Sequence, residues 1–120
     1  MICPLAKFEE VFKTEHGAVY QCSRKNCYWL DFQGSATAFK VRDFLAFKKR
    51  LDGIDLELML SDSSRSYDFE IIMPFRSDRI FILSVGDILK LRDLLTGAKF
   101  MIELNSEVKR CLHSRPVLSL

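Results

Sequence analysis

The chain has few glycines and prolines and no long apolar run. It contains five glycines and three prolines in 120 residues, and charged residues interrupt its apolar segments throughout. No run approaches the ~20 residues that a membrane helix needs. The start, MICPLAKFEEVFK, also lacks the apolar core of a signal peptide. We therefore expect a single cytoplasmic domain over residues 1–120, with no membrane partner.

The chain has no large excess of either positive or negative charge, and it lacks the common catalytic motifs. The net charge is only +2, too small to indicate a nucleic-acid partner. The sequences GxSxG, GxGxxG, HExxH and the P-loop do not occur. His16 and His113 have no nucleophile or carboxylate motif beside them. The chain therefore shows no catalytic residue and implies no cofactor, although an enzyme using scattered groups such as His16, in a pocket between two halves, stays an alternative.

The chain is rich in phenylalanine, and one of its segments resembles another segment further along the sequence. Ten phenylalanines predict a core of bulky aromatics. Residues 39–53 align with residues 83–97 at a shift of 44. Apolar residues recur at helical spacing in both segments, with an acidic residue in the first turn. Five aligned pairs are identical: Val41 and Val85, Asp43 and Asp87, Leu45 and Leu89, Leu51 and Leu95, Gly53 and Gly97.

The two aligned segments predict two helices with defined ends. Ser84 and Asp87 have the spacing of a capping box at the start of the second helix. Gly53 and Gly97 are expected to supply the left-handed residue that ends each helix. The apolar arc of the first helix comprises Val41, Phe44, Leu45, Phe47 and Leu51.

Strand signals precede both helices and are separated by short polar breaks. They are KFEEVF, AVYQCS, CYWLDF and ATAF in the first half, and IDLELML, DFEIIMPF and RIFIL in the second. Short breaks favour antiparallel hairpins. We therefore predict an α+β fold, built as a tandem repeat of an antiparallel β-meander plus a helix, with two helices packed on one antiparallel sheet.

The predicted repeat halves are residues 1–53 and 54–98, followed by a C-terminal extension, 99–120. The extension is compatible with either a strand or a helix. The segment FMIEL alternates like a strand, whereas Leu104, Val108 and Leu112 recur at helical spacing.

Cys22 and Cys27 flank four residues just before an aromatic run. A hairpin here would place the two cysteines opposite each other, and cytoplasmic thiols stay reduced. Three interpretations are open: packing of small half-buried residues, zinc binding, or a redox thiol activated by Arg24 and Lys25. Packing is favoured. A zinc site would need further ligands, so its full set would be Cys22 and Cys27 with Cys3, and Cys111 or His113.

Lys48 and Arg92 form a second pair, because each lies inside the apolar arc of its helix at the same aligned position. In one interpretation, both cations point toward an anionic ligand or partner near a pseudo-two-fold axis. In the favoured one, each buries its stem while its head reaches water or the last carbonyls of its own helix.

The stretch CSRKNCYWLDFQGSATAFKVRDFLAFKKRL resembles a small family of bacterial proteins of unknown function, found mostly in Bacteroidetes. The family has two residues between its paired cysteines, whereas this chain has four. The resemblance implies a bacterial cytosolic origin and no assigned activity. The matching residues are Cys3, Gly17, Cys22, Cys27, Tyr28 or Trp29, Leu30, Phe32, Phe44 and Phe47.

Together these observations predict a non-enzymatic binding or protein-interaction module. The expected partner is a second copy of the chain or another protein, bound through an exposed sheet edge or near the pseudo-two-fold axis. A small zinc protein and an enzyme are the alternatives.

Overall fold

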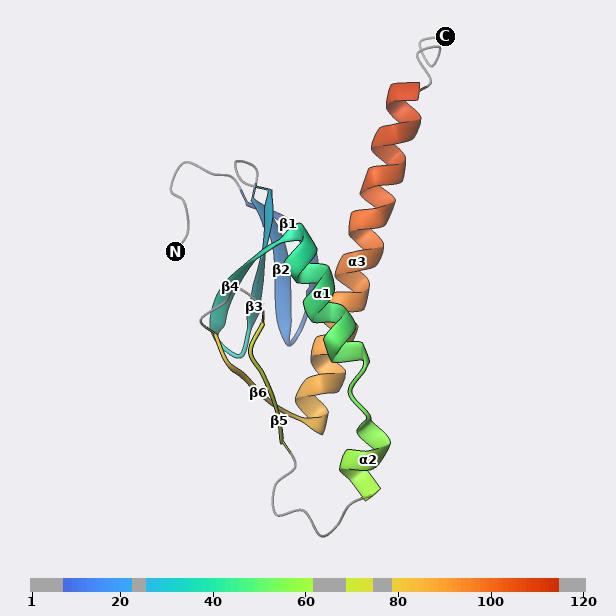
Figure 1. The fold of residues 1–120 in the computed structure, drawn as a ribbon. Coiled ribbons are helices and arrows are strands. Elements are labelled where there is room, and N and C mark those ends of the chain that lie inside the picture. The colour runs from blue at the N-terminus through green and yellow to red at the C-terminus, as the bar shows by residue number, and fades with distance from the viewer. Residues whose placement is uncertain (1–7, 23–25, 62–68, 75–78, 115–120) are drawn as a thin grey trace.

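The computed structural model describes residues 8–22, 26–61, 69–74 and 79–114. A four-stranded antiparallel sheet has the order β1-β2-β3-β4 and carries two helices, α1 and α3, on one face (Figure 1). Its strands are β1 (Phe8–Thr14), β2 (Gly17–Cys22), β3 (Cys27–Phe32) and β4 (Ser35–Lys40). The helices are α1 (Val41–Asp52), α2 (Leu56–Ser61) and α3 (Val85–Ser114). A second antiparallel sheet pairs β5 (Phe69–Ile72) with β6 (Phe81–Ser84). The α+β prediction is confirmed.

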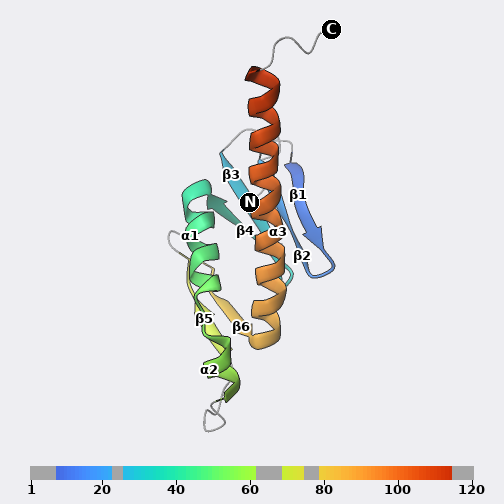
Figure 2. The same ribbon diagram turned by 90° about the vertical axis from the view of Figure 1, so that its right-hand side faces the viewer.

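The core lies between the sheets and the two long helices, which lie side by side in Figure 2. Phe39 stacks on Phe47 with ring centroids 5.2 Å apart, and Phe47 contacts Phe81 of β6 at 5.0 Å. Tyr28 and Phe44 complete this group of rings. Full burial of one such side chain contributes about 1.5–3 kcal/mol. The predicted aromatic core is confirmed, and it joins both halves of the chain.

The aligned segments of α1 and α3 have matching burial. Their deeply buried pairs are Phe44 and Ile88, Phe47 and Leu91, and Leu51 and Leu95. The prediction was wrong for Leu45 and Leu89, which are 41% and 49% exposed. Both leucines follow the most buried residue of the first turn, so the helix rotation directs them away from the sheet.

The capping box at the start of α3 is confirmed. The Asp87 N–H donates to Ser84 Oγ at 3.1 Å, and the Ser84 N–H donates to Asp87 Oδ2 at 3.1 Å. These two bonds satisfy amides that the first turn of a helix leaves unpaired. At the corresponding place in α1, Lys40 makes no side-chain cap bond.

The second half departs from the expected meander at IDLELML, which contains α2 rather than a strand. The N–H of Leu58 donates to Asp55 Oδ1 at 3.1 Å, so Asp55 caps this short helix. Among the described residues, two strands then precede α3, where four precede α1. Both halves end in a hairpin followed directly by a helix, and the tandem repeat itself stays a hypothesis.

Both glycines expected to end helices differ from the prediction. Gly53 ends α1 but has φ −83°, which is not left-handed. Gly97 lies inside α3, which continues to Ser114, so the C-terminal extension is helical as far as that residue. A Cβ on Gly97 would lie 2.2 Å from the Phe12 ring. The glycine therefore allows β1 to pack closely on the helix backbone.

Candidate functional sites

The paired cysteines lie in the predicted hairpin. β2 and β3 are antiparallel, and Gln21 pairs with Tyr28. The next pair outward in this register is Cys22 with Cys27. Both alternate with core-facing residues, so they lie on the sheet face opposite the core. Cys27, at the end of β3, also lines a hollow with Val41 and Leu45 of α1. Cys22 is buried and Cys27 half-buried. Directly opposed residues have Cβ atoms about 4.5–5.5 Å apart, so the hairpin alone brings these two thiols together.

The other expected zinc ligands are not part of a described cluster. Cys111 lies on the exposed C-terminal end of α3. Cys3 and the side chain of His113 lie outside the described residues, as do Arg24 and Lys25 of the hairpin turn. Across the described ranges, no group of three or more His, Cys, Asp or Glu side chains is placed to hold a metal ion. The zinc site therefore remains a prediction.

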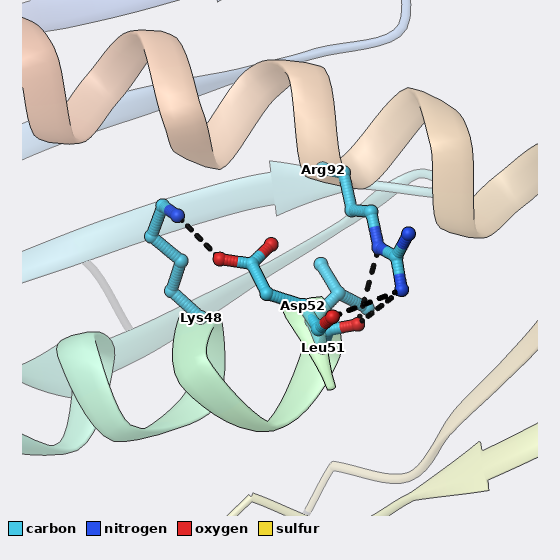
Figure 3. Close-up of polar contacts among 4 residues, drawn as sticks. All are labelled: Lys48, Leu51, Asp52 and Arg92. Atoms are coloured by element: carbon cyan, nitrogen blue, oxygen red, sulfur yellow. Dashed lines mark hydrogen bonds and ion pairs between the residues drawn. The ribbon is translucent and has the colours of Figure 1, made fainter. Parts of the chain in front are cut away.

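Lys48 and Arg92 both act at the C-terminal end of α1 (Figure 3). Lys48 Nζ lies 2.5 Å from Asp52 Oδ2, one turn further along the same helix. Arg92 reaches across from α3 and donates to the carbonyl oxygens of Leu51 at 3.0 Å and Ile54 at 2.7 Å. Carbonyls at a helix C-terminus lack partners and carry partial negative charge, so a guanidinium stabilises them. Arg92 thus caps the C-terminal end of α1. The favoured interpretation of the sequence had its head group reaching water or the last carbonyls of its own helix.

Arg79 is an important residue that sequence reasoning missed. Its guanidinium donates to the carbonyl oxygen of Phe32 at 3.0 Å and to Thr37 Oγ1 at 3.0 Å. It also lies 4.2 Å from the centre of the Phe81 ring. Burial lowers the pKa of Arg79, and the charge of Asp31 opposes that shift. Through these hydrogen bonds, Arg79 links the segment just before β6 to the β3–β4 turn. A single arginine after a polar break carries no periodic signal that would reveal this.

The β5–β6 hairpin carries large apolar residues on both faces, with Glu70 on the inner face and Ser84 on the outer face. Its inner face contributes Ile72, Phe81 and Leu83 to the core. Its outer face, here called the hairpin face, is 50–64% exposed and comprises Phe69, Ile71, Met73, Ile80 and Ile82. Ile71 and Ile82 are directly paired at its centre. Such a patch on a protein surface is typical of an interaction site.

A second exposed apolar surface follows the C-terminal part of α3, which extends beyond the sheet (Figures 1 and 2). Its residues, here called the α3 stripe, recur every four positions and are 43–62% exposed: Phe100, Leu104, Val108 and Leu112. The sequence indicated the helical spacing of the last three. It did not indicate that the stripe would lack a covering layer among the described residues.

His16 lies exposed in the turn between β1 and β2. Its backbone N–H donates to Thr14 Oγ1 at 3.1 Å, and its Nε2 lies 3.4 Å from Glu15 Oε1. The two halves of the chain meet instead through their apolar core, as in the contact of Phe47 with Phe81. The enzyme alternative, with a pocket between the two halves, stays a hypothesis.

Comparisons with known proteins complete the description. Within the described parts of the chain, no helix is both long and apolar enough to cross a membrane. The chain has no match among curated proteins and none among solved structures. A family model, described as a family of unknown function (DUF6686), matches residues 2–109, which is most of the chain. The chain therefore belongs to the family of unknown function DUF6686.

Proposed function

We propose that this protein is a non-enzymatic, cytoplasmic interaction module that forms a homodimer through the hairpin face. The observation that carries the proposal is the exposure of five large apolar side chains on one side of β5 and β6. Exposed apolar patches of this kind are typical of surfaces that contact a partner.

The composition of the β5–β6 hairpin supports the proposal that a partner covers its outer face. A strand with apolar residues on both faces is typical of a sheet buried between two layers. A two-stranded sheet is also marginally stable alone and gains from packing on either face. The hairpin packs its inner face on the core through Ile72 and Leu83 and leaves Ile71 and Ile82 in solvent.

A second copy of the chain suits the hairpin face because its five side chains are all apolar. None of them is ionisable, so these side chains themselves would place no unpaired charge in a two-fold contact. A two-fold interface places the same patch on both subunits, which requires this kind of self-compatibility. Two sheets pack face to face at about 10 Å. Opposed isoleucine pairs fill that spacing well.

The competing surface is the α3 stripe. It is flanked by Glu103, Glu107, Lys109 and Arg110, with a pair between Arg110 and Glu107. A charged rim of both signs suits a helical partner whose charges are arranged to match. The five side chains of the hairpin face are all apolar, so a contact made by them depends on shape and apolar area, and we assign self-association to this face.

The test is sedimentation velocity over a hundredfold concentration range. The wild-type chain should shift from monomer to dimer, and Ile71→Gln with Ile82→Gln should remain monomeric. The matched control, Leu104→Gln with Val108→Gln, alters two exposed apolar residues of α3 and should dimerise like the wild type. A wild-type chain that stays monomeric, or a control that alone loses the dimer, would overturn the assignment.

A zinc site is a second candidate, favoured by one observation: the β2–β3 register, continued one position beyond the pair of Gln21 and Tyr28, opposes Cys22 and Cys27 on one sheet face. Two thiolates brought together by a hairpin supply half of a tetrahedral site. Cys3, and Cys111 or His113, would complete it. Metal analysis of protein purified without chelator should then find about one zinc per chain, lost in Cys22→Ser with Cys27→Ser. Less than ~0.2 zinc per chain would exclude it.

A further inference from the structure

A hollow of about 280 Å³ lies on the face of the four-stranded sheet opposite the helices. Its lining residues come from all four strands: Phe8, Tyr20, Trp29, Asp31 and Ala36. Tyr20 pairs with Trp29 across β2 and β3, and Asp31 pairs with Ala36 across β3 and β4. None of these residues belongs to the hairpin face. The hollow adjoins the cysteine pair, because Phe8 is the register partner of Cys22.

The hollow exists because large and small side chains alternate across the strands. Trp29 is opposed by Ala38 on β4, and Asp31 is opposed by Ala36. These short neighbours leave the indole ring standing above the sheet. On the other side, Phe8 meets Trp29 edge to face, with ring centroids 6.2 Å apart and an angle of 84° between planes. The two rings form adjoining walls, and Tyr20 lies between their strands.

The electrostatics of the hollow favour positive charge. The faces of aromatic rings carry negative potential and attract cations, tryptophan most strongly. Asp31 adds a carboxylate at the exposed rim. Glu10 pairs with Tyr20 and therefore lies on the same side of the sheet. Two described cations lie near Asp31. Arg79 is influenced by the charge of Asp31, but its guanidinium donates to the carbonyl oxygen of Phe32 and to Thr37. Lys13 is on the same sheet face and is separated from Asp31 by Ala18 on β2.

Other ligand classes fit less well. A calcium ion takes six to eight oxygen ligands, and only one carboxylate lines the hollow. An anion would meet Asp31. A drug-sized molecule needs a pocket of about 300–1,000 Å³, and this one is smaller and open on one side.

We propose that the hollow binds an organic cation, specifically an alkylated ammonium head group. The methyl groups of such a head contact Trp29, Tyr20 and Phe8, and its positive charge is balanced by Asp31. Recognition of alkylated ammonium groups is a known use of grouped aromatic side chains. The four-stranded sheet therefore provides a ligand site on the face that its helices leave uncovered.

Trp29 is the only tryptophan of the chain, so its fluorescence reports on the site directly. The probe is choline, titrated at constant ionic strength. Its neutral isostere, 3,3-dimethylbutan-1-ol, has the same shape without the charge. Choline should produce a saturable change in Trp29 fluorescence, and the isostere should bind at least about tenfold more weakly because it lacks the cation–π attraction.

Variants separate the proposal from simple apolar binding. Asp31→Asn should weaken choline binding about fivefold or more by removing the charge partner. Ala36→Leu should abolish binding by filling the hollow while leaving Asp31 in place. The control, Glu107→Gln, removes an acidic residue from α3 and should bind within about twofold of the wild type. Circular dichroism checks that each variant is folded.

Three results would overturn the proposal: equal binding of choline and its isostere, no saturation by choline, or unchanged affinity in both the Asp31 and Ala36 variants. Choline binding should also persist in the Ile71→Gln and Ile82→Gln variant. The outcome is therefore distinct from that of the dimerisation experiment.

Discussion

Gly97→Ala is expected to destabilise the protein, against the usual effect of this substitution in a helix. Alanine is favoured over glycine inside a helix by about 1 kcal/mol. At Gly97, however, the added methyl group would lie 2.2, 2.4 and 2.6 Å from three atoms of the Phe12 ring. Overpacking of this kind costs about 1–3 kcal/mol. We expect a net loss of about 1 kcal/mol in the free energy of unfolding, with β1 displaced from α3.

Urea denaturation followed by circular dichroism measures this loss, and two other glycines are matched controls. A Cβ on Gly86 would meet its nearest atom at 3.8 Å, and one on Gly53 would meet carbonyl oxygens at 3.5 and 3.6 Å. Alanine at either site should be neutral or stabilising by up to about 1 kcal/mol. Phe12→Leu should recover part of the loss in Gly97→Ala. Stabilisation by Gly97→Ala equal to that of the controls would refute the close-packing argument.

Three further perturbations follow from the described contacts. Arg92→Met removes the cap on the carbonyl end of α1 and should lower the free energy of unfolding by about 1–3 kcal/mol. Lys48→Met removes a partly solvated ion pair and should lower it by at most about 1 kcal/mol. Equal losses for the two variants in urea titrations would contradict the cap. Ser84→Ala breaks the capping box and should cost about 0.5–2 kcal/mol, with a smaller loss in Ser84→Asn; no difference between the two would contradict that role. Burial raises the pKa of Tyr28 above its ordinary value. Near and above pH ~10, the Tyr28 hydroxyl therefore keeps its proton in the folded state but loses it in the unfolded state. Stability should therefore fall as the pH rises above about 10, and a Tyr28→Phe variant with the same alkaline decline would refute this.

Local patterns in the sequence were sufficient for elements whose residues decide their own conformation. The helix from Val41 and the capping box at Ser84 were predicted because apolar spacing and side-chain bonds to nearby amides act within one or two turns. The Cys22–Cys27 hairpin followed from two alternating segments around a polar break. The prediction of a strand at IDLELML failed because it followed the alternation of the segment. Its Leu, Glu and Met residues are good helix formers, and Asp55 caps the helix that they form.

Contacts between distant segments decided the rest. Gly97 has a sequence context typical of a helix end, and the Phe12 ring from β1, 85 positions earlier, gives it a different role.

 Arg92 and Arg79 appear in the sequence as ordinary basic residues, yet each donates to carbonyl oxygens far away in the chain. No local pattern encodes such a bond, because both partners are brought together only by packing.

The sequence by itself determined the α+β class, the aromatic core and the starts of the two long helices, since these depend on side-chain periodicity and on bonds between neighbouring residues. The tertiary structure alone decided which apolar residues reach the surface. Ile71 and Ile72 are adjacent and chemically identical, yet one is 64% exposed and the other 1%. Strand alternation separates them, and only the position of the helices and the core determines which side is covered.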